Sequence, residues 1–360
     1  MFLSLFKYWL ALVSLLLTLC GFTFPGQRPA AHLAILCYHH INSPSGRPYS
    51  STLEQFDTQI RTLKKAGFAF ISLQQVENYY YKGSSIPEKS IALTFDDASM
   101  TVYRDAYPYL KKNNIPFALF IYPSITQYGQ KKYACTWAQL KEMQANGVTM
   151  GCHSYYHPIL ASPGLGDRVY SPEGYAKWLK LQTAGAKQIL EENLGVSINY
   201  FAIPFGAADT TVHQAIKAAG YTLCFNVSGG NNDAESSPLN LNRTIVLTKH
   251  TAQDVLSIVT PRLLDISTSP NNFARIYADD VTISISVENT AAFISPYIFE
   301  GTFLPERVVT PDTQGHITLP VHLRKPGFFM CSLRTTDKQG KPYKGTWLFI
   351  YTKKKPSFLL

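Results

Sequence analysis

The sequence is poor in charge and in cysteine, and it contains no internal repeat and no low-complexity tract. Charged residues make up 16% of its 360 residues and hydrophobic residues 46%, which excludes a disordered chain and allows two or three globular domains. After Cys20 only five cysteines remain, an odd number at irregular spacings, without a Cys-x-x-Cys pair. We therefore expect no disulfide framework, and the cysteines within apolar runs are expected to be buried thiols.

The N-terminus lacks an apolar run of the about 20 residues that a membrane-spanning helix needs. Lys7 precedes a shorter run, Tyr8–Leu19, which is typical of a signal peptide. The residues before Cys20 form a poor cleavage site, so an uncleaved anchor that extends through Phe24 remains open. Residues 1–24 are therefore predicted to be a signal peptide or an N-terminal membrane anchor. In either case we expect an exported protein of the periplasm or cell envelope, either anchored to the inner membrane or secreted.

Acidic residues are scarce near the C-terminus, where most of the net charge of +9 resides. From Val321 to Leu360 there are nine Lys or Arg residues and one acidic residue, Asp337, a net charge of +8. Such a segment could bind nucleic acid, anionic lipid or an acidic polymer, or it could form a solvated surface. Since no nucleic-acid-binding motif accompanies it, we expect no nucleic-acid partner.

Between Leu33 and about Ile258, short apolar runs alternate with longer amphipathic ones. The apolar runs predict strands at 32–38, 68–73, 90–95, 117–122, 148–152, 200–204, 221–225 and 243–247. Four amphipathic runs predict helices that each end at a glycine, at 53–66, 137–146, 175–194 and 211–219. This alternation is typical of a parallel sheet covered by helices. We predict an α/β fold: a distorted (β/α) barrel of about seven strands over residues 33–264, with reactive residues at the carboxyl ends of its strands.

The pattern changes after residue 264. Asp265–Phe273 is rich in Ser, Thr, Pro and Asn and is predicted to be a linker. Beyond it helical periodicity disappears, and "VTISISV" and "ITLPVHL" alternate apolar with polar residues. Residues 271–360 are therefore predicted to form an antiparallel β-sandwich accessory domain.

Two adjacent carboxylates, Asp96 and Asp97, follow the apolar run "SIALTF". Burying a carboxylate is costly unless another group compensates its charge. One explanation is a helix N-cap, because an Asp there accepts backbone N–H bonds. The other is a metal or acid–base site. The predicted strand "VTMGC" leads into "HSYYH", which places His153 and His157 at the same rim, and two imidazoles with one carboxylate suit a catalytic divalent ion.

A third polar element follows the predicted strand "YFAIP". In Pro204-Phe205-Gly206 the proline lacks an N–H, so the exposed donor is the amide of Phe205. A backbone donor aimed at a metal site is what an oxyanion hole requires. A plain turn between a strand and a helix is the alternative.

The order "LTFDD", "HSYYH", "IPFG" resembles the polysaccharide deacetylases of carbohydrate esterase family 4, also called the NodB-homology domain. The segments "ILCYHHI" and "YSSTLEQFDTQIRTLKKAGFAFISLQQV" look like the subgroup that de-N-acetylates poly-N-acetylglucosamine. The likeness covers roughly Leu33 to Val255 and leaves the C-terminal β region unmatched.

The resemblance implies a role for each motif. Asp96 would be the catalytic base, and Asp97, His153 and His157 would hold the metal ion. The amide of Phe205 would stabilise the oxyanion, with Pro204 contacting substrate. His39 and His40, at the end of the first predicted strand, could face the same rim and contact substrate, and a structural or solvent-facing pair is the alternative.

The sequence departs from the family pattern in places. Ala98 stands where the family usually has a Gly, and Ala202 replaces an Arg that steadies the base. Arg243 could supply that charge from a neighbouring strand, unless it is a surface residue. His250 is a candidate general acid, although an extra residue precedes it.

The resemblance therefore implies a metal-dependent hydrolase that removes N-acetyl groups from an amino-sugar polysaccharide of the cell envelope or exopolysaccharide. One divalent ion is expected, with zinc first and cobalt, nickel or iron as alternatives. A catalytically degenerate barrel that only binds glycans is the second hypothesis, motivated by Ala98 and Ala202. A non-haem iron oxygenase fits less well, because a second Asp beside the ligand has no role there. The expected partner is an N-acetylglucosamine polymer, and the oligomeric state stays open.

Overall fold

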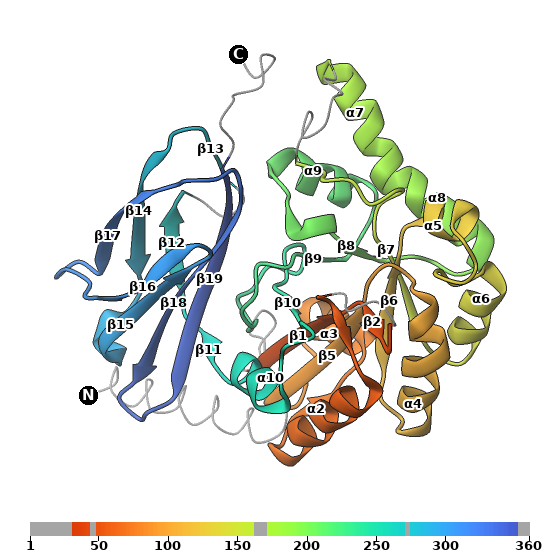
Figure 1. The fold of residues 1–360 in the computed structure, drawn as a ribbon, viewed down its shortest axis with the longest axis horizontal. Coiled ribbons are helices and arrows are strands. Elements are labelled where there is room, and N and C mark those ends of the chain that lie inside the picture. The colour runs from red at the N-terminus through yellow and green to blue at the C-terminus, as the bar shows by residue number, and fades with distance from the viewer. Residues whose placement is uncertain (1–30, 44–47, 162–170, 271–273, 352–360) are drawn as a thin grey trace, which may run out of the picture.

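The computed structural model describes residues 31–43, 48–161, 171–270 and 274–351 (Figure 1). The predicted signal peptide or anchor at residues 1–24 lies outside these ranges, as do Lys353, Lys354 and Lys355. Within them, no helix combines the length and the apolar character that crossing a membrane would require.

One parallel sheet forms the larger part of the molecule. Its strands are β1 (His32–Tyr38), β4 (Ala69–Phe70), β5 (Lys89–Phe95), β6 (Phe117–Ile121), β7 (Thr149–Cys152), β8 (Tyr200–Ala202), β9 (Leu223–Phe225) and β10 (Thr244–Ile245). Seven of them run in the order β10-β1-β5-β6-β7-β8-β9, with β4 paired to β5, and each of these pairs is parallel. One isolated bridge, Phe225 to Leu241, joins β9 to the segment that leads into β10. The predicted parallel sheet is confirmed, in a form consistent with a distorted barrel.

Helices cover the outer face of this sheet, except α3 (Leu73–Lys82), whose apolar side packs against the opposite face of β1 and β5 (Figure 1). They are α2 (Leu53–Lys65), α3 (Leu73–Lys82), α4 (Tyr107–Lys112), α5 (Pro123–Tyr128), α6 (Trp137–Ala145), α7 (Pro172–Lys180), α8 (Ala186–Leu194), α9 (Thr210–Ala218) and α10 (Ala252–Val259), with π-helical turns at Val102–Ala106 and Leu181–Gly185. Capping boxes at Thr52 and Thr136 begin α2 and α6, where each side chain accepts from a backbone N–H in the first turn. The helix predicted at 175–194 is α7 and α8 joined through one of the π-helical turns.

The C-terminal part consists of two further sheets. The larger has the order β11-β19-β18-β15-β16, with β13 paired to β19, and the smaller has the order β12-β14-β17. Their bounds are β11 (Arg262–Leu263), β12 (Ile266–Ser269), β13 (Arg275–Ile276), β14 (Asp280–Val287), β15 (Phe293–Gly301), β16 (Leu304–Val309), β17 (His316–His322), β18 (Gly327–Asp337) and β19 (Pro342–Tyr351). Side chains from both sheets share one hydrophobic cluster around Phe299, Ile285 and Trp347.

Two details differ from the expected organisation. Four residues of the predicted linker, Ile266–Ser269, are strand β12 and pair antiparallel with β14, because Ile266 packs into the apolar cluster of this region. The sheets are also not wholly antiparallel, since β11 and β13 both pair parallel with β19.

Strand β19 also packs against the barrel. Leu348 and Ile350 are buried in the hydrophobic cluster that holds the barrel strands and helices. The Thr346 hydroxyl donates a hydrogen bond of 2.7 Å to the carbonyl of Gly229. The C-terminal part therefore contributes side chains to the hydrophobic core of the barrel.

The five cysteines of the described residues are all buried free thiols: Cys37, Cys135, Cys152, Cys224 and Cys331.

Candidate active site

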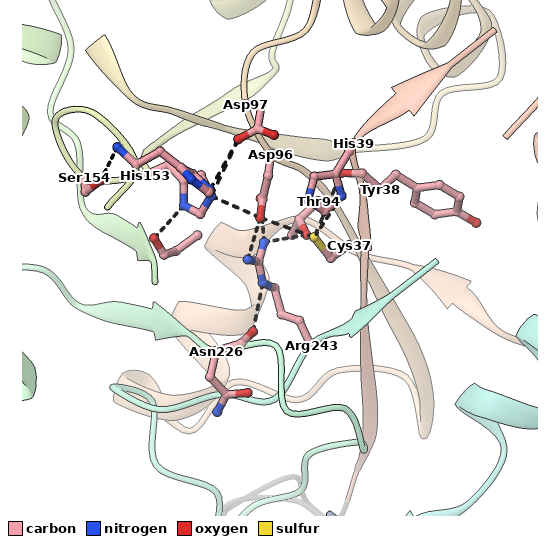
Figure 2. Close-up of polar contacts among 12 residues, drawn as sticks. Cys37, Tyr38, His39, Thr94, Asp96, Asp97, His153, Ser154, Asn226 and Arg243 are labelled. Carbon is pink, nitrogen blue, oxygen red and sulfur yellow. Dashed lines mark hydrogen bonds and ion pairs between the residues drawn. The ribbon is translucent and has the colours of Figure 1, made fainter. Parts of the chain in front are cut away.

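The acid pair and the histidine motif lie together where two strands of the sheet end. Strand β5 ends at Phe95 and is followed by Asp96 and Asp97, and β7 ends at Cys152 and is followed by His153. Both strands flank β6 and run in the same direction, so their carboxyl ends form one rim. Figure 2 shows Asp96, Asp97 and His153 pointing toward one another from this rim.

Asp97, His153 and His157 form a group whose ligand atoms all lie within 4.8 Å of one another. Asp97 Oδ1 lies 3.6 Å from Nε2 of His157 and 3.9 Å from Nε2 of His153. Two atoms that each lie about 2.1 Å from one zinc ion can be no more than about 4.2 Å apart, so these separations fit a shared ion. The donor set of two nitrogens and one oxygen is also suitable for a catalytic divalent ion with open positions.

Both imidazoles are held in the form that binds metals. His153 Nδ1 lies 2.7 Å from the carbonyl of Ala202, and because a carbonyl only accepts, this nitrogen carries the proton and Nε2 presents its lone pair. Burial lowers the pKa of His153 to about 3 and also lowers the pKa of His157. Both rings are therefore neutral near pH 7, as metal binding requires.

Asp96 is held differently from its neighbour. It is 2% exposed, and its Oδ1 and Oδ2 accept hydrogen bonds of 2.7 and 2.8 Å from the two terminal nitrogens of Arg243, which is fully buried (Figure 2). Burial would raise the pKa of Asp96, but the charge and hydrogen bonds of Arg243, together with His153, hold that pKa well below its ordinary value. Asp96 is consequently a buried carboxylate that stays ionised.

Arg243 is itself fixed by the surrounding strands. Its Nη1 donates to the Thr94 hydroxyl at 3.1 Å and its Nε donates to the carbonyl of Asn226 at 3.2 Å. The residue precedes β10, which pairs with β1, so the charge reaches Asp96 from beyond β1 and not from a strand beside Ala202. The predicted substitute for the missing arginine thus lies in bidentate contact with Asp96.

A second group of ligand atoms, from Cys37, His39 and Asp96, is less suited to a metal ion. Both oxygens of Asp96 already accept from a buried cation, Arg243. Burial raises the pKa of the Cys37 thiol well above its usual range, so this sulfur stays protonated and donates to Asp96 at 3.3 Å. The geometry therefore favours Asp97, His153 and His157 as the ligand set.

The backbone of the rim adopts conformations that non-glycine residues rarely take. Asp97, Ala98, His157 and Phe205 all have left-handed φ angles, of 70°, 47°, 60° and 58°. Such angles cost about 1–2 kcal/mol each and persist where the surroundings impose them, often at active sites. Ala98 therefore keeps the turn geometry that a glycine would adopt without strain.

These residues surround a cavity of about 380 Å³. It is lined by His39, His40, Pro48, Tyr49, Asp96, Asp97, His153, His157, Ile203, Phe205, Val227 and Ile245. The ring of Phe205 is half exposed and packs edge-on against His157, with centroids 4.6 Å apart. The volume is in the range typical of small-ligand sites.

The predicted site residues divide into two groups. The structure brings Asp96, Asp97, His153, His157, Phe205, Arg243, His39 and His40 together at or beneath this cavity. His250 is not among the lining residues: its Nδ1 accepts from the backbone N–H of Leu247, in the turn that precedes α10. Pro204 is buried behind the lining rather than part of it.

Other residues of the site were not predicted from the sequence. Cys37 contacts Asp96 and Thr94 contacts Arg243 from within the strands, and the ring of Tyr49 lies tilted against that of His39, with centroids 5.2 Å apart. Val227 lines the cavity and lies against Gly206. Only Cys37 and Thr94 carried a signal, as polar residues near the ends of apolar strands.

Comparison with known proteins gives consistent results. The family described as polysaccharide deacetylase matches residues 83–224. A poly-beta-1,6-N-acetyl-D-glucosamine N-deacetylase of Staphylococcus aureus is 28% identical over 212 residues, which cover 56% of this chain and 69% of that protein.

Two solved structures resemble the chain over about two thirds of its length. IcaB from Ammonifex degensii is 30% identical with a TM-score of 0.56, over 64% of this chain and 97% of IcaB. The Streptococcus pyogenes deacetylase PplD, solved in complex with acetate, is 26% identical with a TM-score of 0.56, over 65% of this chain and all of PplD.

Proposed function

The chain belongs to the polysaccharide deacetylase family, carbohydrate esterase family 4, and is an N-deacetylase of that family; we propose that it removes acetyl groups from poly-N-acetylglucosamine. The names of its relatives support this substrate. The observation that carries the proposal is the pairing of an ionised, buried Asp96 with a neighbouring set of two neutral imidazoles and a carboxylate.

We propose that Asp97, His153 and His157 hold one divalent ion, with zinc the expected ion for this nitrogen and oxygen donor set. When bound, such an ion supplies Lewis acidity toward an acetamide carbonyl and lowers the pKa of a water molecule. The hydrogen bond from His153 to Ala202 orients the ring toward that position.

Asp96 acts as the general base. Its carboxylate accepts the proton of the water that attacks the acetamide carbon, and Arg243 keeps that carboxylate oriented and ionised beforehand. The oxygen of the carbonyl gains negative charge in this step, and the N–H of Phe205 is proposed to donate to it. When the carbon–nitrogen bond breaks, the sugar nitrogen takes up a proton and acetate leaves.

His39 is the better candidate for delivering that proton. It lines the cavity on the side of Asp96 away from His153 (Figure 2), whereas His250 lies outside the lining. Its ring packs against the ring of Tyr49. His40, whose Nδ1 lies 2.9 Å from the Ser99 hydroxyl, is proposed to shape the same wall and contact substrate.

The predicted division into a barrel at residues 33–264 and a C-terminal accessory unit at 271–360, whose two sheets would form a β-sandwich, is proposed with an earlier boundary, because β11 and β12 already pair with strands of the C-terminal sheets. Leu348 and Ile350 contribute to the core of the barrel, so the two parts are expected to unfold together. Export to the cell envelope, with residues 1–24 as signal or anchor, is proposed from the N-terminal sequence.

Acetate release from soluble N-acetylglucosamine oligomers, with and without a chelator, tests the proposal. We expect release that stops on chelation and returns when zinc is added. Release that is unaffected by complete metal removal would refute the metal-dependent mechanism. Binding of the oligomers without any release would favour the alternative, a degenerate barrel that only binds glycans.

A further inference from the structure

A second cavity, of about 670 Å³, lies in the C-terminal part and shares no lining residue with the cavity at Asp96. It opens where β16 and β17, each at the edge of its sheet, approach the start of β18. We call it the basic groove, and its chemistry comes from Phe303, Arg307, His322, Arg324, Lys325 and Phe329.

The basic groove carries positive charge that its own lining does not compensate. Arg307, Arg324 and Lys325 are basic residues, and the lining contains no carboxylate. Of the acids nearby, Asp280 contacts His322, itself a lining residue, at 2.8 Å, and Glu306 contacts Arg334, which does not line the groove, at 3.0 Å.

Among the described residues, no ion pair joins Arg307, Arg324 or Lys325 to a carboxylate. Arg307 instead donates to the backbone carbonyl of Pro320 at 3.3 Å, which ties β16 to β17 and leaves its charge at the groove. A cavity lined by one sign of charge concentrates ligands of the opposite sign.

Phe303 adds a flat apolar surface to these cations. Its ring is 87% exposed, and its backbone has a left-handed φ of 61°. The turn that holds it is fixed, because the Thr302 N–H donates to the carbonyl of Met330 at 2.8 Å. Buried Phe329 meets the Phe303 ring edge-on, with centroids 6.3 Å apart. Phe303 therefore touches the core through one edge and leaves most of its surface open beside the cations of the groove.

We infer that the basic groove binds an acidic polysaccharide whose sugar rings carry carboxylates. A uronate unit presents a ring face for Phe303 and a carboxylate for Arg307 or Arg324 within one residue of polymer, and guanidinium groups match carboxylates with two parallel hydrogen bonds. This inference rests on the proposed function in one respect: such a polymer would hold the deacetylase within the matrix that contains its substrate.

Other occupants match the groove less well. A second copy would bring three cations against three cations in a two-fold symmetric contact. A planar bilayer cannot follow a concave cavity, and a polyol-phosphate chain has no ring to stack on Phe303. Single-stranded nucleic acid stacks successive bases on several exposed rings, whereas this groove offers one.

The test measures binding of polygalacturonate to the full chain by titration calorimetry. We expect that Phe303→Leu, which keeps apolar bulk but not a flat ring, and the double variant Arg324→Gln with Lys325→Gln each weaken binding by about tenfold or more. Binding should also weaken steeply as NaCl rises from about 50 to 200 mM. Thermal unfolding of each variant verifies that the fold is intact.

The matched control is Lys338→Gln with Lys341→Gln, which removes two charges from the exposed turn at the opposite end of β18. This pair should change affinity by less than about threefold. Equal weakening by both pairs would overturn the inference, because net charge alone would then explain binding. It would also be overturned if Phe303→Leu bound normally, or if oligothymidylate, poly(glycerol phosphate) or phosphatidylserine vesicles bound as tightly as polygalacturonate.

Acetate release by the unaltered protein is measured on neutral oligomers in parallel. Loss of the proposed function would appear as no release while polygalacturonate still binds. Failure of the groove would appear as normal release with no specific binding.

Discussion

Replacement of Arg243 by Met should be among the most damaging single changes at the site. The guanidinium is fully buried, and four of its hydrogen bonds end on Asp96, Thr94 and Asn226. Met has similar volume but no charge, so the Asp96 carboxylate would remain buried without its counterion. Removing one partner of a buried ion pair costs about 3–5 kcal/mol, a large part of the about 5–15 kcal/mol that stabilises a typical domain.

The measurement is urea unfolding in the presence of a chelator, so that metal occupancy does not differ between variants. Arg262→Met is the control, because Arg262 is one-third exposed and pairs with exposed Glu88 at 2.7 Å. That surface pair should contribute about 0–1 kcal/mol. If the two substitutions cost the same, the argument from burial is wrong.

A double-mutant cycle then identifies the partner. In an Asp96→Asn background, Arg243→Met no longer leaves a buried charge without its counterion. Its cost in free energy of unfolding should therefore fall by about 1–3 kcal/mol. An unchanged cost would show that Arg243 stabilises the fold through contacts other than Asp96. On acetate release, Arg243→Met should lower kcat by about 10²–10⁴-fold, and Arg243→Lys less, since a lysine keeps the charge but not the paired hydrogen bonds.

Further predictions concern the metal ligands, the rim and the barrel core. Asp97→Asn should weaken zinc binding at least about tenfold, measured as metal content after dialysis, because an amide is a poorer ligand than a carboxylate; undiminished zinc would contradict the ligand assignment. Gly206→Ala should lower the free energy of unfolding by about 1–3 kcal/mol more than Gly147→Ala does. Both glycines have a positive φ, but only at Gly206 would a Cβ lie 2.7–2.8 Å from Val227. Equal unfolding midpoints for the two variants would contradict this prediction. Burial lowers the pKa of His32 despite its hydrogen bond to a backbone carbonyl, so the unfolded chain binds the proton more tightly. The free energy of unfolding should therefore fall as pH drops below about 6.5, by up to about 1.4 kcal/mol per pH unit. Unfolding curves measured at several pH values should show a smaller dependence on pH for His32→Phe.

Local patterns predicted the elements well where periodicity and end signals agreed. Strand β1 was predicted at its observed residues, and the helix at 53–66 differs from α2 by one residue, since Thr52 begins it and Gly67 follows its end. Strand β12 was missed because three of its four residues, Ser267, Thr268 and Ser269, are polar and resemble a linker until β14 lies beside them.

The sequence already implied that Asp96, Asp97 and His153 would lie close together, because their motifs directly follow predicted strands. This inference needs only the alternation of strands and helices, because carboxyl ends of parallel strands share one rim. The sequence offered Arg243 and His39 only as candidates with alternatives, and the tertiary structure decided that Arg243 pairs with Asp96 and that His39 lines the cavity. Arg243 reaches Asp96 across 147 residues of chain, and His39 lines the cavity while His250 does not. Such choices depend on how the barrel closes and where each side chain points, and no local spacing in the sequence encodes either.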